Sequence, residues 1–213
     1  ECKSTYLYLA QAQLHLEQYL PAIASLQKCH ELAQNRPGYY RLRIRAELGV
    51  KNYEKALEIA EQAQSQFPQA SELQFDSLWV LTKVGLIHTA LDQAQALLTR
   101  PSNSSANLLL LARIARHGIR YPKAKALLEQ LLHTHPTHGP LHFEAGLGYA
   151  QLGLHKVSAR FFEQADQLGH PAAFEAADQY RLAQNSRKAL ELNARMDPGK
   201  KQLEHRLTIY LSD

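Results

Sequence analysis

The stretch Tyr53-Glu-Lys-Ala-Leu-Glu-Ile-Ala60 is one of five related octapeptides in this chain of 213 residues. The other four begin 34 residues, or a multiple of 34, away from it, at Tyr19, Ile87, Tyr121 and His155. The fourth position of each is small, and a sixth small residue follows 31 residues after the last: Ala22, Ala56, Ala90, Ala124, Ser158 and Ala189. Prolines recur with a similar period, where a helix must end: Pro37, Pro68, Pro101, Pro136, Pro171 and Pro198. This spacing indicates a repeat architecture.

Composition decides which kind of repeat this is. The chain holds 36 Leu and 29 Ala but only 18 Val, Ile and Thr together, which favours helices over strands. Apolar residues make up 45% of the chain, which argues against long-range disorder. No run of apolar residues is long enough to span a bilayer. We therefore expect a soluble, nearly all-helical protein.

Each repeat reads as a helix of about 13 residues, a tight turn, a second helix and a loop marked by proline. The small residue lets the two helices approach closely, and neighbouring pairs must share a core because one pair cannot bury enough apolar surface. We expect a single solenoid over 1–213, with repeats near 4–37, 38–68, 70–101, 105–136, 139–170 and 171–198. Residues 199–213 are an extra helix, either a cap or a truncated seventh repeat, with Leu203, Leu207, Tyr210 and Leu211 at helical spacing. The only methionine is Met196, so we expect a piece of a longer protein.

These repeats resemble the tetratricopeptide repeat. The fifth repeat carries the pattern best, with Gly146, Tyr149, Gly153, Ser158, Phe162 and Ala165, and the first carries Tyr6, Leu9, Ala10, Tyr19, Ala22 and Cys29. The resemblance implies an all-α fold, a right-handed superhelix of stacked antiparallel helix pairs with about six repeats plus one extra C-terminal helix. It also implies a concave groove, lined by the first helix of each repeat, that binds peptides. The predicted function is a protein–protein interaction scaffold.

The resemblance places one residue of each repeat at the centre of this groove: Leu7, Tyr40, Phe75, Leu109, Phe143 and Phe174. One helical turn later it places Trp79, Arg113 and Leu147. The first set is wholly apolar, and aromatic side chains are common binding anchors. The alternative is that these side chains pack against the adjacent repeat.

Arg113, Arg116 and His117 form a small basic face on the first helix of the fourth repeat. With Trp79 one repeat away, they suggest a protein partner that carries apolar residues and an acidic group. The alternative is ordinary ion pairing with neighbouring repeats. Two further functions stay open. One is RNA binding by a helical-repeat protein, which the apolar row and a net charge of only +4 disfavour. The other is a structural or regulatory segment of a bacterial cell-envelope assembly or secretion component.

No catalytic set of residues and no phosphate-binding loop emerges, so we expect neither an enzyme nor a cofactor. The four histidines between 133 and 142 could bind zinc, nickel or copper, or lie in a solvated loop: His133, His135, His138 and His142. Cys2 and Cys29 form either a disulfide or two separate thiols. The compartment stays open between the cytoplasm and a bacterial periplasm, because no native N-terminus is visible.

Overall fold

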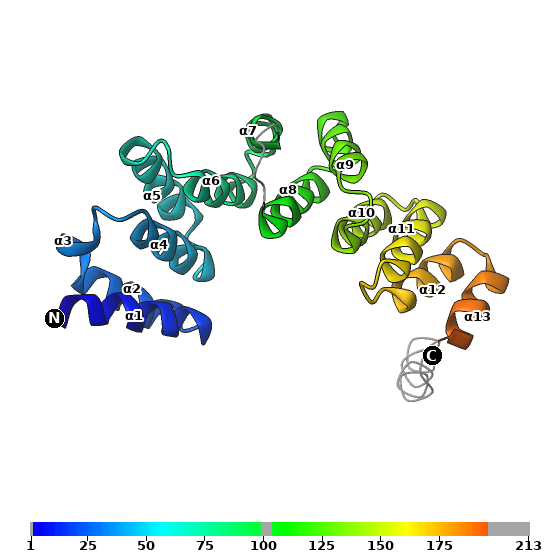
Figure 1. The fold of residues 1–213 in the computed structure, drawn as a ribbon, viewed down its shortest axis with the longest axis horizontal. Helices are drawn as coiled ribbons and strands as arrows, with labels where there is room; N and C mark the ends of the chain where they lie inside the picture. The colour runs from blue at the N-terminus through cyan, green and yellow to red at the C-terminus, as the bar shows by residue number, and fades with distance from the viewer. Residues whose placement is uncertain (1, 99–103, 196–213) are drawn as a thin grey trace. The chain divides into compact units, whose positions relative to one another are not determined.

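The computed structural model describes residues 2–98 and 104–195, and within them every regular element is an α-helix. The chain divides into two compact units, Glu1–Leu97 and Leu98–Asp213, and a single solenoid over 1–213 stays a prediction. We refer to the two units as unit 1 and unit 2. The all-helical architecture of stacked pairs confirms the predicted α-solenoid class (Figure 1).

Unit 1 contains three helix pairs and one additional short helix. Its elements are α1 (Cys2–His15), α2 (Tyr19–Lys28), α3 (His30–Ala33), α4 (Pro37–Gly49), α5 (Tyr53–Gln66), α6 (Ser71–Val84) and α7 (Ile87–Leu98), whose last residue belongs to unit 2. Helix α4 packs against α1, α2, α5 and α6, so the first helices of the repeats share a core with the second helices. The single turn α3 is the one element that the repeat pattern did not predict.

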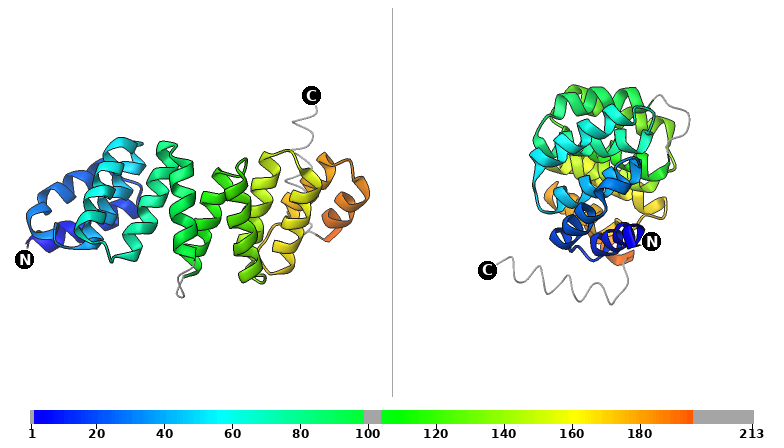
Figure 2. Two further views of the ribbon diagram at one scale, coloured as in Figure 1. Left: turned by 90° about the horizontal axis from the view of Figure 1, so that it is seen from above. Right: turned by 90° about the vertical axis from the view of Figure 1, so that its left-hand side faces the viewer.

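Unit 2 contains the other three pairs. They are α8 (Ser105–His117) with α9 (Pro122–Thr134), α10 (Gly139–Gln151) with α11 (His155–Gln167), and α12 (Ala173–Leu182) with α13 (Ser186–Arg195). Successive helices of unit 2 lie side by side (Figure 2). The expected extra helix over 199–213 lies outside the described residues.

The small residues of the 34-residue series all lie on second helices and are buried. Ala22, Ala56, Ala90, Ala124 and Ser158 have no exposed surface, and Ala189 is 7% exposed. In the fifth repeat the contact is direct, because the Ser158 hydroxyl on α11 donates to the Gly146 carbonyl of α10 at 2.8 Å. In this pair the small side chain therefore stands at a direct contact between the two helices.

The turns between paired helices repeat as faithfully as the anchors do. Five of the six first helices end with one residue in the left-handed region, at Glu17, Lys51, Gly85, Gly153 and Gln184. At each, the next N–H donates to a carbonyl five residues earlier, as Asn52 does to Glu47 at 2.9 Å. This is the Schellman motif, which normally favours glycine. Three of the five turns form it without glycine, so the packing of the pair imposes the conformation.

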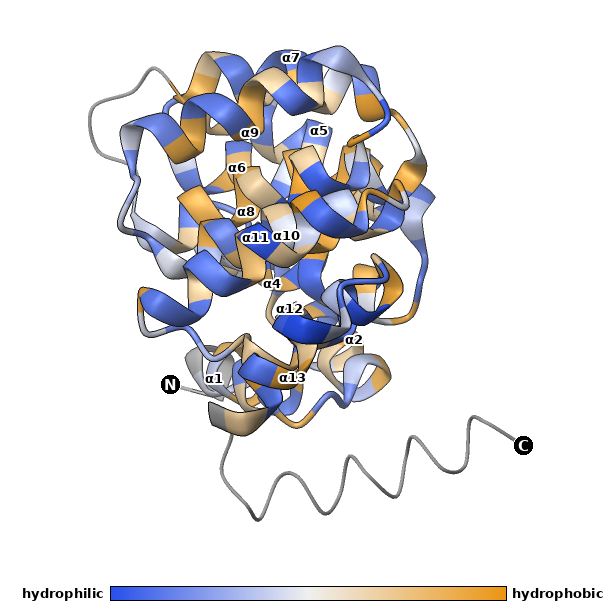
Figure 3. Cartoon of the chain, turned by 90° about the vertical axis from the view of Figure 1, so that its right-hand side faces the viewer, coloured by the Kyte–Doolittle hydropathy of each residue, from blue (hydrophilic) through white to orange (hydrophobic). Residues whose placement is uncertain are grey.

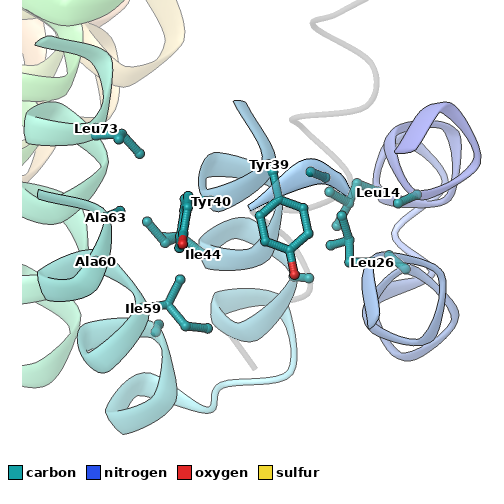
Figure 4. Close-up of a cluster of buried hydrophobic side chains, with 14 of the residues drawn as sticks. Leu14, Leu26, Tyr39, Tyr40, Ile44, Ile59, Ala60, Ala63 and Leu73 are labelled. Carbon is teal, nitrogen blue, oxygen red and sulfur yellow. The ribbon is translucent and has the colours of Figure 1, made fainter. Parts of the chain in front are cut away.

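The core of unit 1 is built around two adjacent tyrosines. Tyr39 and Tyr40 are each 1% exposed, and their rings meet edge to face with centroids 5.4 Å apart (Figure 4). Their hydroxyls do not stay unpaired: Tyr40 donates to Gln66 Oε1 at 2.7 Å, and Tyr39 lies 2.8 Å from His30 Nδ1. Both rings can therefore be buried without loss of hydrogen bonds.

The core of unit 2 includes the close contact of α10 with α11. Phe162 is 1% exposed, and its ring packs over Gly146, where a Cβ atom would come within 2.7 Å of the ring. The ring of Phe143 meets that of Phe162 edge to face at 5.3 Å. Apolar and polar residues alternate along α11, which buries one side only, whereas α10 is buried or half-buried all along residues 139–150 (Figure 3).

Replacing Gly146 by Ala tests the close approach of α10 and α11. We expect Gly146→Ala to lower the free energy of unfolding by about 1–2 kcal/mol, because overpacking outweighs the better helix propensity of Ala. Gly38→Ala is the matched control, since a Cβ atom on this helical glycine of α4 would meet nothing within 4 Å. The control should be neutral or slightly stabilising in urea denaturation. Equal effects of both variants would contradict the packing.

Candidate partner-binding face

The predicted groove residues of unit 2 lie on its first helices, α8, α10 and α12. Leu109, Arg113 and His117 follow one another at helical spacing on α8, and Leu147 lies on the neighbouring α10. Leu109 and Leu147 are half-buried, and Arg113 and His117 are exposed. Together with Arg116 we call these residues the α8–α10 face.

One carboxylate organises this face. Glu144 on α10 accepts from Arg113 Nε at 3.0 Å through one oxygen and from Arg116 Nε at 2.7 Å through the other. The Glu144 side chain is 6% exposed, against 48% for Arg113 and 21% for Arg116. A carboxylate this deeply buried needs such partners, because an unpaired charge there would be costly. The predicted alternative of ion pairing between neighbouring repeats therefore does occur here.

The ion pairs use only part of each guanidinium group. An arginine carries five N–H donors, and Arg113 and Arg116 each offer Glu144 the one on Nε. Their η nitrogens make no hydrogen bond to any residue that the structure describes. The cluster of two arginines and one glutamate keeps one net positive charge, with Arg113 at the surface.

The two phenylalanines of the predicted groove differ in their surroundings. Phe143 is half-buried, and its ring packs between Phe162 and His170, with the His170 centroid 4.9 Å away. Phe174 on α12 is 48% exposed. Of this pair, only Phe174 is exposed.

In unit 1 the predicted groove residues lie mostly in the core. Tyr40 and Phe75 are 1% and 4% exposed, which corrects the expectation that they line an open surface. Leu7 packs against the core from a half-buried position. Trp79 is half-buried, with Lys83 Nζ 4.4 Å from its ring centroid. Trp79 belongs to unit 1 and Arg113 to unit 2, and their joint action stays a prediction.

The sequence did not predict a second cluster of charged side chains, which joins α4 to α6. Arg41 donates from Nε to Asp76 at 2.7 Å and from an η nitrogen to Glu72 at 2.9 Å. The sequence places both ion-paired acids, which were not predicted, at equivalent positions. Asp76 and Glu144 each directly follow a phenylalanine of the predicted groove row. Burial raises the pKa of Asp76 even though the Arg41 guanidinium beside it acts in the opposite direction.

The four histidines do not form a metal site. No group of His, Cys, Asp or Glu side chains in the described parts of the chain could hold a metal ion. His138 Nε2 lies 2.7 Å from the Ser105 hydroxyl, His142 Nε2 donates to the Pro136 carbonyl, and His135 lies 2.8 Å from the Thr134 hydroxyl. Because three of the rings turn to separate partners, the metal hypothesis for His133, His135, His138 and His142 is wrong.

Cys29 is a buried free thiol whose pKa is raised by burial. Its sulfur donates to the Leu26 carbonyl at 3.4 Å. The side chain of Cys2 lies outside the described residues.

None of the helices over the described ranges is both long and apolar enough to cross a membrane.

Solved structures of known proteins are similar to the chain. PilW, a widely conserved type IV pilus biogenesis factor, is 17% identical, with 92% of each chain covered and a TM-score of 0.70. YrrB, a TPR protein with an unusual peptide-binding site, is 16% identical over 87% of this chain and 89% of its own, with a TM-score of 0.52. A human IFIT1 dimer with PPP-AAAA is 21% identical over 95% of this chain and 52% of its own, with a TM-score of 0.56.

The fold is that of a tetratricopeptide-like helical repeat. This confirms the resemblance seen in the sequence. No protein-family model matches the chain, and no curated protein does. The similarity therefore concerns the fold alone.

The raised pKa of Asp76 predicts how unit 1 responds to acid. The raised pKa means that the folded state binds this proton more readily than the unfolded chain does. The contribution of Asp76 to the free energy of unfolding is therefore least favourable above its folded pKa, and it improves as the pH falls through that value. Asp76→Asn removes the titration. Urea denaturation from about pH 7 down to about pH 4 should therefore show the wild type gaining stability relative to Asp76→Asn. A relative loss on acidification would contradict burial as the dominant effect.

Proposed function

We propose that this protein is an interaction scaffold that binds a segment of a partner protein on the α8–α10 face. The fold supports a general scaffold role, since the similar proteins include a TPR protein with a peptide-binding site and a pilus biogenesis factor. The observation that carries the proposal is the pair of arginines held by one buried glutamate, with η nitrogens that make no hydrogen bond within the part of the chain that the structure describes.

The chemistry of the face defines the partner segment. Planar guanidinium groups bind carboxylates through paired charge-assisted hydrogen bonds. The half-buried Leu109 and Leu147 offer apolar surface beside them. A segment that places an acidic side chain next to aliphatic or aromatic residues satisfies both parts of the face.

The distribution of charge in unit 2 favours a protein partner over RNA. Residues 105–134 hold five Lys and Arg against one Glu, whereas residues 139–195 hold six basic and six acidic residues. A single-stranded nucleic acid needs a continuous basic track with stacking aromatic rings. The exposed Phe174 instead shares its helix with Glu175 and Asp178. RNA is nonetheless an outcome of the test, because the fold also occurs in the IFIT1 dimer with PPP-AAAA.

Selection from a phage-displayed random peptide library against the whole chain tests the proposal. We expect enriched peptides to place Asp or Glu beside apolar residues. Arg113→Gln should weaken their binding about tenfold, the equivalent of about 1.4 kcal/mol, while Arg116 continues to hold Glu144 and the fold. Arg160, which is also exposed and lies on the second helix α11, provides the matched control: Arg160→Gln should bind like the wild type.

Two results would overturn the proposal. One is equal affinity of the Arg113 and Arg160 variants for the selected peptides. The other is a library that yields no binder while a single-stranded RNA pool binds with a strong salt dependence, which would assign the face to nucleic acid.

A further inference from the structure

We propose that Glu144 tunes the α8–α10 face toward carboxylates and against phosphate esters, although it touches no partner itself. This inference rests on the proposed function, because it concerns the acidic group that the face would take. Glu144 is thus a positioning and specificity-determining residue that acts through Arg113 and Arg116.

The geometry makes Glu144 the support of both arginines. Each of its oxygens accepts one Nε–H, and with 6% of its side chain exposed it has almost no surface to offer a ligand. Binding through Nε leaves the outer edge of each guanidinium, with its η nitrogens, available for an anion. Glu144 therefore lies behind the arginines and the ligand in front of them.

The spacing of α8 and α10 keeps this arrangement fixed. A Cβ atom at Gly148 on α10 would lie 3.7 Å from Arg116 Cγ, an ordinary van der Waals distance, so the stem of Arg116 lies close to the backbone of α10. Arg116 is the less exposed of the two arginines. Its guanidinium is held by Glu144 through Nε.

Charge balance gives the selectivity. The two arginines and Glu144 sum to one positive charge, which a carboxylate neutralises. A phosphate monoester carries a charge of about −1.5 to −2, so the buried carboxylate behind the arginines repels it about twice as strongly as it repels a monoanion. Electrostatic energy is proportional to the ligand charge. Removing the charge of Glu144 must therefore strengthen the binding of a dianion about twice as much, on a logarithmic scale, as that of a monoanion.

Glu144→Gln is the variant that tests this, because the amide oxygen can still accept from an arginine while the charge is gone. The probes are acetate and inorganic phosphate, titrated into the whole chain labelled with ¹⁵N. The readout is the Nε–Hε signals of Arg113 and Arg116, assigned with Arg113→Lys and Arg116→Lys. In the wild type we expect both anions to shift these signals, and the ratio of the two affinities is the reference for the variants.

In Glu144→Gln we expect acetate affinity to rise about threefold to tenfold, and phosphate affinity about tenfold to a hundredfold. Glu144→Asp, which keeps the charge, should retain the wild-type ratio of the two affinities and serves if Glu144→Gln does not fold. An unchanged ratio of the two affinities in Glu144→Gln would overturn the role of Glu144. If neither anion moves the Arg113 signal in the wild type, the acidic-partner function itself fails.

Discussion

The closest approach of the two helices in each pair is the constraint on which this structure depends. At that point the second helix carries a residue no larger than Ser or Ala, and five of these six residues have no exposed surface. A short hairpin closed in this way still exposes most of its apolar side chains, which neighbouring pairs then cover. Repetition every 34 residues follows from that constraint, since each new pair must again present the same small contact and the same apolar surfaces.

The proposed α8–α10 face is a consequence of the same packing. When α8 and α10 lie side by side, the position after Phe143 is buried between them, and the chain places Glu144 there. A buried acid requires basic partners, and Arg113 and Arg116 reach it from the preceding repeat. The interaction that joins two repeats thus also fixes two guanidinium groups at the surface of the solenoid.

The sequence predicted the helix pairs and the small anchors because both leave a periodic pattern of residue types. It could not predict the left-handed residues at Glu17, Lys51 and Gln184, since nothing in those side chains favours that conformation and only the packed pair requires it. The sequence also placed Tyr40 at the centre of a groove, whereas the side chain is buried. An apolar stripe on a first helix looks the same whether it faces a groove or a neighbouring repeat. The role of Glu144 depended on a contact between residues about 30 positions apart, which no local pattern records.

Replacing the small residue at the helix contact by a larger one tests most directly whether that residue closes the pair. Ala124 on α9 is fully buried, whereas Ala126, two residues along the same helix, is exposed. Measured by urea denaturation, Ala124→Leu should lower the free energy of unfolding by at least about 1–3 kcal/mol, and Ala126→Leu should change it by no more than about 0.5 kcal/mol. If the two variants were equally stable, the small residue would not be what closes the helix pair.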